Sequence, residues 1–422
     1  MNVKQITAFL VATLATAHVA AAEPYEWAGG SVFREYIYNS EAVDTGKAPR
    51  KHFSEIDPGS KRTEMAELKA NPRAPRLMTL STKGVERAEL LPEYWSGHSG
   101  TTAWLQVNRR PWVPLPRPAG TPGPAEHYYH TVLGSRAVPV ALKDLIDGEN
   151  TFRFTAGPQV WGSFDWGFYW IYAFTLRLYH PRAAEHPTAS IANVKSGDAL
   201  GENPPITVAV QPGGAPIKRV DVFAYYEDCN YSGSGFHREW HGQTIYGRPH
   251  QHVGSATAAP WTVHWNTEWV ADQSQPIRLA ARVVDEAGWH TVTPIVENVR
   301  FSPRARKVTL IRASEMPPGF GVRAGREMTC VLDVPSLPKK PAHARIKLLT
   351  WSGSHVERIR LNGVQLSPKI GREHDFSIDT IEVPPEAVKL GRNEFAMFSA
   401  TTHHAAEVDW PGPVLLLEFG EK

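Results

Sequence analysis

The stretch Thr350-Trp351-Ser352-Gly353, followed by Ile359-Arg360-Leu361-Asn362-Gly363, occurs near the C-terminal end of this 422-residue chain. An earlier stretch has the same pattern: Tyr94-Trp95-Ser96-Gly97, followed by Leu105-Gln106-Val107-Asn108. Each alternates apolar and polar residues and ends in Asn or Asn-Gly, which tolerate positive φ and favour a tight turn. Both regions are therefore predicted to contain a strand that ends in a turn.

Two further pairs of blocks follow in the same order. Residues 142–152 and 383–395 share Gly-x-Asn-x-Phe, beginning at Gly148 and Gly391. Asp165-Trp166 leads to an apolar run at 175–179, and Asp409-Trp410 leads to one at 414–419. Matching blocks in one order indicate an internal repeat. We infer two copies of one domain, at about 24–185 and 306–422.

Period-two patterns dominate the chain. Large side chains stand at every second position in residues 102–108, 151–155 and 277–283, as in half-buried strands. The 35 Pro and 33 Gly residues favour many turns over long helices. The chain is predicted to be all-β, with β-sandwich packing.

The repeated blocks resemble a known family. Leu361-Asn362-Gly363, Val383-Pro384-Pro385 and Leu390-Gly391-Arg392-Asn393-Glu394-Phe395 are similar to galactose-binding-like jelly rolls. The resemblance covers about 110 C-terminal residues and, less clearly, the N-terminal copy. It implies a jelly-roll fold of the kind found in sugar-binding modules and in accessory domains of secreted glycosidases.

The region between the copies has strand patterns with a different spacing and resembles a bacterial immunoglobulin-like module. The Cys pair with a central Trp is absent, so the resemblance implies only the sandwich. We expect a signal peptide at 1–22, an N-terminal jelly roll at 23–185, an immunoglobulin-like domain with a His-rich insertion at 188–303, and a C-terminal jelly roll at 306–422. Residues 181–187 and 302–306 are the expected linkers.

The first 22 residues have the features of a secretory signal. Lys4 precedes an apolar stretch too short to span a bilayer, and Ala20-Ala21-Ala22 offers a small-residue cleavage site. The protein is therefore expected to be secreted or periplasmic, without a membrane span. Export would permit a disulfide between Cys229 and Cys330, but only geometry decides whether they pair. The formal charge of +2, from 45 basic and 43 acidic residues, gives no reason to expect nucleic-acid binding.

Residues typical of a carbohydrate site gather in the N-terminal copy. Aromatic faces stack on sugar C–H groups, and a carboxylate accepts hydroxyl hydrogen bonds. Alternatively, several of these rings belong to the sandwich core. The occurrence of Asp-Trp in both copies favours a shared structural role, such as an Asp turn with the Trp closing the sandwich. The candidate ligand-binding residues are His127, Tyr128, His130, Trp161, Asp165, Trp166 and Trp170.

The insertion of the middle region offers candidate metal ligands. Asp228, Asn230 and Ser232 alternate as in the start of a Ca²⁺ loop, although no Glu stands at the bidentate position. His237 and His241 share a face, suitable for Zn²⁺, only in a helix. The alternatives are a turn held by Asx hydrogen bonds and an exposed His-rich loop. No other cofactor is expected.

The sequence carries no catalytic signature. Glu126, Asp165, Glu239 and Asp272 are available carboxylates, but no motif links them. The function expected is carbohydrate binding without catalysis. The alternative is a secreted glycoside hydrolase or polysaccharide lyase, with its site in the N-terminal domain or at a domain junction. The oligomeric state stays open.

Overall fold

The computed structural model describes residues 29–39, 53–54, 76–96, 103–115, 131–132, 137–156, 170–182, 185–229, 243–245, 247–367, 369–373, 375–402 and 404–420. Regular structure within these ranges consists of β-strands and three short 3-10 helices, with no α-helix. The all-β prediction is confirmed for this part of the chain. None of its helices has the length and apolar character needed to cross a membrane.

The N-terminal sandwich consists of two antiparallel layers. One layer has the strand order β3-β9-β5-β6. The other has the order β1-β10-β4, with β7 and β8 on β4 and β2 on β10. The bounds are β1 Val32–Asn39, β2 Phe53–Ser54, β3 Arg76–Leu80, β4 Arg87–Ser96, β5 Ala103–Val107, β6 Val113–Pro114, β7 Thr131–Val132, β8 Val138–Val140, η1 Leu142–Asp144, β9 Gly148–Ala156 and β10 Trp170–His180.

The C-terminal sandwich also has two layers. One has the order β24-β29-β26-β27, and the other β22-β31-β25-β30-β23 with β28 on β25. The bounds are β22 Lys307–Arg312, β23 Gly321–Val322, β24 Arg326–Val334, β25 His343–Trp351, η2 Gly353–His355, β26 Arg358–Leu361, β27 Val364–Leu366, β28 Phe376–Val383, η3 Pro385–Ala387, β29 Gly391–Ser399, β30 Ala406–Val408 and β31 Val414–Phe419.

These two sandwiches share one topology. The layer β3-β9-β5-β6 corresponds strand for strand to β24-β29-β26-β27, and β1-β10-β4 corresponds to β22-β31-β25. A 3-10 turn precedes β9 and another precedes β29, as η1 and η3. The internal repeat predicted from the sequence is therefore confirmed by the strand order.

A hydrogen-bonded pair of asparagines, half-buried Asn108 and fully buried Asn150, explains why the motif recurs. In the N-terminal sandwich Asn108 Nδ2 donates to Asn150 Oδ1 over 2.7 Å, and Asn150 Nδ2 donates to the carbonyls of Ile146 and Gly148. Asn108 has a φ of 47°, and its side-chain oxygen accepts from the Thr151 amide over 2.8 Å. The two side chains thus fasten the end of β5 to the turn that enters β9.

The C-terminal sandwich repeats this arrangement. Asn362 Nδ2 donates to Asn393 Oδ1 over 2.8 Å, and Asn393 Nδ2 donates to the carbonyls of Lys389 and Gly391. Asn362 has a φ of 50°, and Asn393 is fully buried. Buried amides need this full set of partners, so the Asn residues of the repeat serve as scaffold.

The middle sandwich lies between the two copies. Its smaller sheet has the order β11-β13-β18, and its larger sheet contains β12-β21-β19-β20, with β14 on β19 and β17 on β14. A separate hairpin, β15-β16, belongs to the insertion between β14 and β17. The bounds are β11 Thr188–Ile191, β12 Ala199–Leu200, β13 Pro205–Gln211, β14 Ile217–Tyr225, β15 Gln243–Ile245, β16 Arg248–His250, β17 Gly254–Ala256, β18 Thr262–His264, β19 Ile277–Asp285, β20 Trp289–Val292 and β21 Val296–Phe301.

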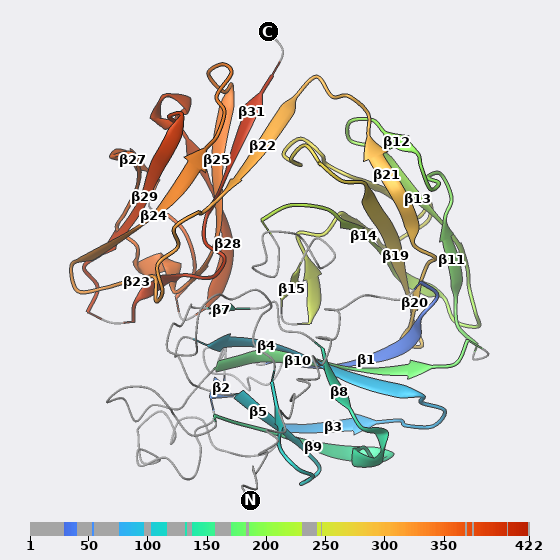
Figure 1. Ribbon diagram of the computed structural model, residues 1–422. Coiled ribbons are helices and arrows are strands. Elements are labelled where there is room, and N and C mark those ends of the chain that lie inside the picture. Colours follow the sequence, from blue (N-terminus) through green and yellow to red (C-terminus); the bar gives the residue numbers. More distant parts are fainter. Residues whose placement is uncertain are drawn as a thin grey trace, which may run out of the picture.

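The N-terminal and middle sandwiches share a sheet. β1 pairs with β10 on one side and with β20 on the other, so Phe33 lies opposite both Tyr179 and His290. The result is a continuous 12-stranded sheet (Figure 1). Because β1 would otherwise be an edge strand with unpaired backbone groups, this pairing protects it. The sequence predicted two separate sandwiches and did not indicate this continuity.

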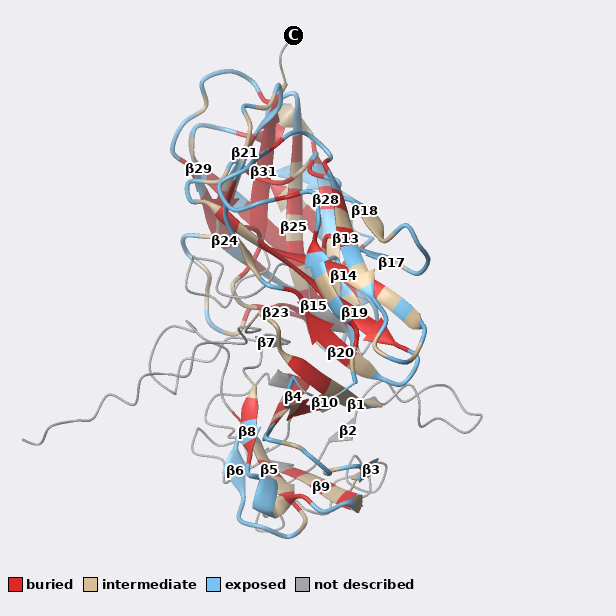
Figure 2. Ribbon diagram, turned by 90° about the vertical axis from the view of Figure 1, so that its right-hand side faces the viewer, coloured by how far each residue is buried: buried red, intermediate tan, exposed pale blue. Residues whose placement is uncertain are grey.

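Each sandwich has its own apolar core, visible as buried strands in Figure 2. Phe152, Phe154 and Phe174 fill the N-terminal core and pack at centroid distances of 5.2 Å. A smaller cluster around Ala271 and Leu416 packs the middle sandwich against the C-terminal one. The three sandwiches surround the β15 hairpin (Figure 1).

Candidate functional site

Most of the predicted ligand-binding residues lie outside the described residues. These are His127, Tyr128, His130, Trp161, Asp165 and Trp166. Trp170 is the first residue of β10, where its backbone pairs with Trp95 and Ser54. The aromatic site in the N-terminal copy therefore stays a prediction.

Of the predicted metal ligands, only Asp228 lies in the described part. Asn230, Ser232, His237 and His241 lie outside it. Asp228 is 5% exposed, accepts from the Cys229 amide over 2.6 Å, and lies 3.8 Å from Lys347 Nζ. This carboxylate thus faces a cation of the C-terminal sandwich. No group of three or more potential metal ligands occurs among the described residues.

The two cysteines are unpaired in the structure. Burial raises the pKa of the Cys229 thiol to about 12, and burial also raises the pKa of Cys330. Both thiols are therefore protonated at neutral pH and are poor nucleophiles.

Five charged side chains form an ion network across the shared sheet. Four of them are buried, Glu35, Arg177, Asp221 and Arg282, and the fifth, Arg219, is partly exposed. Glu35 Oε1 accepts from Arg177 Nε over 2.7 Å and from Arg282 Nη1 over 3.2 Å. Arg282 Nη2 donates to Asp221 Oδ2 over 3.0 Å, and Arg219 Nε donates to Asp221 Oδ1 over 2.7 Å. The network links β1 and β10 of the N-terminal sandwich to β14 and β19 of the middle one.

The network continues at both ends. Ser255 Oγ donates to Asp221 Oδ1 over 2.6 Å, and His252 Nε2 lies 2.7 Å from the same hydroxyl. At the other end Tyr179 donates its hydroxyl to Glu89 Oε1. Between them His290 Nδ1 lies 3.8 Å from Glu35 Oε2.

Burial shifts the protonation of these groups. Burial raises the pKa of Asp221, but Arg282 and Arg219 outweigh burial, so its pKa is lowered and it stays ionised. Burial lowers the pKa of Arg177 to about 9 and raises that of Tyr179 to about 12. Burial, aided by Arg282 and Arg177, lowers the pKa of His290 well below its usual value, so the imidazole is neutral at pH 7.

Perturbed pKa values can mark either a functional site or a structural network. Here every carboxylate of the five-residue network has a guanidinium partner. The partners come from both sandwiches, at the place where β1 meets β20. We assign the ion network a structural role: its ion pairs hold together the two sandwiches that share the sheet.

Asp409 begins a turn, as expected for the Asp-Trp pair, but its side chain takes no part in closing it. Its carboxylate is fully buried, and neither oxygen has a hydrogen-bond partner among the described residues. Burial, with Glu407 nearby, raises the pKa of Asp409 well above its usual value, so the side chain is neutral at pH 7. The turn is closed instead by the Gly412 amide donating to the Asp409 carbonyl over 2.9 Å. A turn therefore begins at Asp409, as expected, and it is closed through the backbone carbonyl of this residue.

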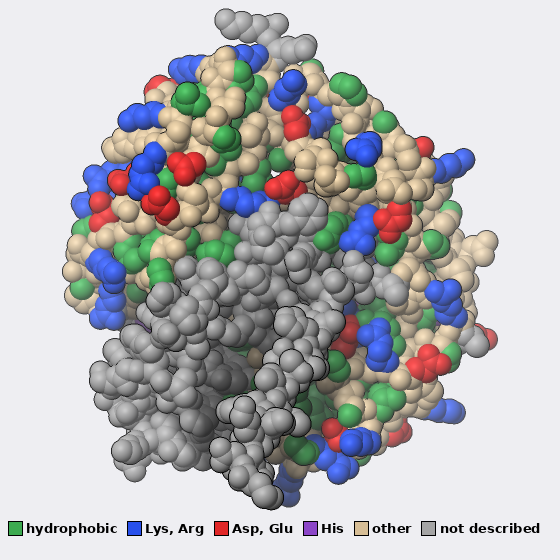
Figure 3. Space-filling model, viewed as in Figure 1, with side chains coloured by type: hydrophobic (Ala, Val, Ile, Leu, Met, Phe, Trp, Pro, Cys, Tyr) green, Lys and Arg blue, Asp and Glu red, His purple; other side chains and the backbone are tan. Residues whose placement is uncertain are grey.

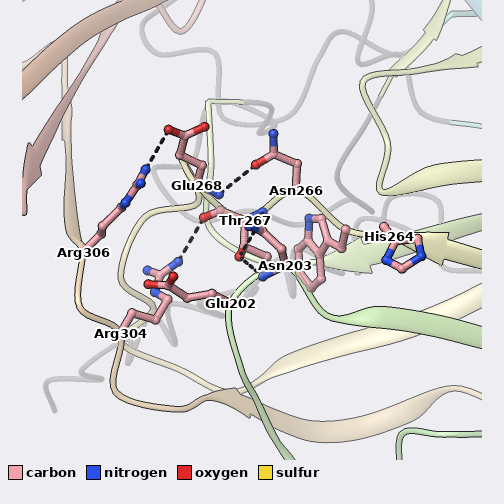
Figure 4. Close-up of a pocket in the computed structure, with 9 residues that line it drawn as sticks. Glu202, Asn203, His264, Asn266, Thr267, Glu268, Arg304 and Arg306 are labelled. Carbon is pink, nitrogen blue, oxygen red and sulfur yellow. Dashed lines mark hydrogen bonds and ion pairs between the residues drawn. The ribbon is translucent and has the colours of Figure 1, made fainter.

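An open recess of about 400 Å³ lies where the middle sandwich meets the link to β22 (Figure 4). We call it the Glu202 recess. Three segments line it: the turn before β13, the segment after β18, and the link at 304–306. The lining residues are Glu202, Asn203, His264, Trp265, Asn266, Thr267, Glu268, Arg304 and Arg306.

Hydrogen bonds hold the floor of the Glu202 recess. Asn203 and Thr267 exchange two bonds, from Asn203 N to Thr267 Oγ1 over 3.0 Å and from Thr267 N to Asn203 Oδ1 over 2.8 Å. Arg304 donates to the Thr267 carbonyl over 3.2 Å. At the rim Arg306 pairs with Glu268 over 2.7 Å, with both side chains nearly half exposed. The floor is thus fixed, while the rim groups face solvent.

Two rim side chains of the Glu202 recess are exposed and make no hydrogen bond or ion pair with any described residue: Glu202 and His264. Trp265 is 3% exposed and belongs to the core of the middle sandwich, where it packs on Tyr226 and Phe301. The recess therefore presents carboxylate, amide, imidazole and guanidinium groups beside an apolar wall area nearly as large as the polar one. Such groups suit a ligand rich in hydroxyls.

A second recess, of about 290 Å³, adjoins the first and shares Arg304 with it. We call it the Arg300 recess. Its lining residues are Asp272, Gln273, Gln275, Arg300, Phe301, Ser302, Pro303, Arg304 and Lys307.

Neither recess could be located from the sequence. Residues 302–306 were expected to be a linker, and Asp272 was considered only as an isolated carboxylate. Asp272 instead pairs with Arg304 over 2.6 Å. One local feature pointed to the recesses: the short linker contains two arginines, Arg304 and Arg306. A connection that only faces solvent does not require them.

No protein-family model and no curated protein matches the chain. Among solved structures, a β-porphyranase of glycoside hydrolase family 86 from the human gut bacterium Bacteroides plebeius is 11% identical, with a TM-score of 0.23 over 54% of this chain and 37% of that chain. Fibronectin(III)-like modules of Clostridium thermocellum CbhA are 14% identical, with a TM-score of 0.18 over 56% of this chain and 94% of that chain.

Carbohydrate-binding modules of the β-sandwich superfamily are 9% identical, with a TM-score of 0.16 over 55% of this chain and 96% of that chain. The matched region spans about a third of the length of the family 86 structures. Likeness at these TM-scores does not establish a shared function.

Proposed function

We propose that the protein is a secreted or periplasmic carbohydrate-binding protein and that the Glu202 recess takes part in binding. The observation that supports this is the composition of the recess wall. An apolar ligand needs a mostly apolar pocket, whereas polar atoms form slightly more than half of this wall, and two hydrogen bonds between Asn203 and Thr267 hold its floor. Sugar hydroxyls are donors and acceptors together, so carboxylates, amides and an imidazole can all bind them.

The experiment is a glycan array with the full purified protein, followed by calorimetry on each positive glycan. The recess variants are Glu202→Ala and His264→Ala, because neither side chain has a structural partner among the described residues. Glu297→Ala is the matched control, since Glu297 is exposed on β21 of the same sandwich and outside both recesses.

Binding that falls about tenfold in either recess variant, with the control unchanged, would support the proposal. If neither variant affected binding, the carbohydrate site would lie outside the recess, and the aromatic segment at 127–170 would be tested next. Absence of binding to every glycan would refute carbohydrate binding.

A second candidate function is glycan cleavage, because two carboxylates, Glu202 and Glu268, line the same recess. A pair of carboxyl groups is the usual minimum for glycoside hydrolysis. Release of reducing sugar, or absorbance of unsaturated uronides, would support this function if Glu202→Gln abolished it. No turnover on any glycan that binds would exclude it.

A further inference from the structure

We propose that the Arg300 recess binds the anionic groups of an acidic polysaccharide whose neutral sugars occupy the neighbouring Glu202 recess. This inference rests on the proposed carbohydrate-binding function and assigns its ligand class. The anionic group is a carboxylate or a sulfate, since a guanidinium binds both.

The charge of the Arg300 recess supports this ligand. Arg300 and Lys307 are both exposed, and no carboxylate among the described residues pairs with either. The acidic residue of the recess, Asp272, is neutralised by Arg304 at 2.6 Å. The recess therefore carries two uncompensated positive charges in about 290 Å³.

The remaining polar groups of the Arg300 recess can form hydrogen bonds with the hydroxyl groups of a sugar. Gln275 and Ser302 line it, and neither side chain has a hydrogen bond within the described structure. Gln273 is different, because its amide donates to the carbonyls of Glu227 and Ala271 and is fixed in the wall. The recess thus has one amide fixed in its wall, and the side chains of Gln275 and Ser302 are available to bind a ligand.

The wall between the two recesses is rigid. Arg304 lines both, and its side chain is only 5% exposed. Its guanidinium is anchored to the Thr267 carbonyl and to Asp272. One polymer chain that passes over Arg304 would contact both recesses at a fixed spacing.

The same arrangement disfavours a nucleic acid. The phosphate backbone carries a charge at every nucleotide, and Glu202, which has no cationic partner among the described residues, would repel it in the neighbouring recess. Over the described residues of the face seen in Figure 3, acidic and basic side chains are interspersed. A polysaccharide with carboxylate or sulfate groups and many hydroxyls satisfies both recesses.

The experiment measures binding of the full chain to polygalacturonate and to the same polymer after full methyl esterification, which removes charge and keeps the backbone. A sulfated galactan forms a parallel arm, and duplex DNA tests a general polyanion. The variant is Arg300→Gln with Lys307→Gln. The control is Lys83→Gln with Lys369→Gln, which removes the same charge from exposed sites in the other two sandwiches.

We expect an acidic polymer to bind about tenfold more tightly than its neutral form, and the recess variant to lose that difference while the control keeps it. Binding in the wild type should also weaken with salt more steeply than in the recess variant. Whichever of the carboxylate and sulfate polymers shows the difference identifies the anionic group.

This inference would be overturned if charged and neutral polymers bound equally tightly. If Glu202→Ala still weakened that binding, the proposed function would stay intact. Tighter binding to DNA than to either acidic polymer would overturn this inference as well. Failure to bind any polysaccharide would instead overturn the proposed function.

Discussion

Trp351 donates its indole Nε1–H to the hydroxyl oxygen of Tyr172 over 2.6 Å, and the bond joins residues that are 179 positions apart. Both side chains are fully buried, and the Tyr172 ring meets Phe376 edge to face at 4.9 Å. The N-terminal sandwich is thereby fastened directly to the C-terminal one. In the sequence Trp351 was only part of a repeated motif.

We predict that Tyr172→Phe lowers stability by about 1–3 kcal/mol, because it removes the acceptor of a buried hydrogen bond and leaves the rings in place. Urea unfolding followed by fluorescence would measure it. Tyr36→Phe is the control, since its hydroxyl accepts only an exposed amide bond, from Ser81 over 3.3 Å. Equal losses in both variants would contradict the importance of the Trp351 bond.

The asparagine pairs give a second prediction. Asn150→Ala and Asn393→Ala should each cost about 3 kcal/mol, because each substitution leaves several buried backbone groups without partners. Thermal unfolding of the two variants should show similar losses, since the two networks match. Asn266→Ala, at an exposed position with one local bond, should change little. A large loss at one of the two buried positions and none at the other would refute equivalence.

The ion network gives a third prediction. Arg282→Met should destabilise the protein by about 3–5 kcal/mol, because it removes a guanidinium that serves both Glu35 and Asp221 and leaves buried charge behind. Lys218→Met is the control, since Lys218 and its partner Glu286 are both more than half exposed. Guanidinium-chloride unfolding would compare the two. A mild effect of Arg282→Met would show that the network carries little stability.

The fourth prediction concerns pH. The folded pKa of His290 lies well below 6.5, so below pH 6.5 the unfolded chain gains a proton that the folded chain does not. Stability from this group is therefore complete above pH 6.5 and is lost as pH falls, by up to about 1.4 kcal/mol per pH unit. Burial raises the pKa of Glu35, and its protonation opposes this loss.

Comparison of wild type with His290→Gln isolates the histidine. Unfolding free energies measured between pH 7 and 5 should fall more steeply in the wild type than in this variant. His343→Gln is the control, because the His343 side chain is 68% exposed. Parallel pH profiles for wild type and His290→Gln would disprove the assignment.

The all-β class and the duplication could be predicted because both depend on local patterns. Period-two alternation marks strands, and the Asn residues of the repeat are needed for turns that each copy must close. The asparagine side-chain bonds were not predicted, since Asn108 and Asn150 meet only after β5 and β9 pair.

The shared sheet and the recesses could not be predicted for a related reason. Phe33 pairs with His290, which lies 257 positions later in the chain, and no local pattern specifies that partner. The Glu202 recess combines three separate segments, and residues such as Glu202 and Arg304 are ordinary surface types in the sequence. The carbohydrate site at 127–170 stays a prediction.

The position of β1 between β10 and β20 has a practical consequence for anyone who divides this chain. A fragment that ends before residue 188 would keep β10 beside β1 but lose β20, so the backbone amides and carbonyls at the start of β1 that face β20 would have no partner. Exposed edges of that kind recruit other chains. Isolated N-terminal fragments should therefore self-associate, and a cut after residue 301 would be the safer place to separate the polypeptide.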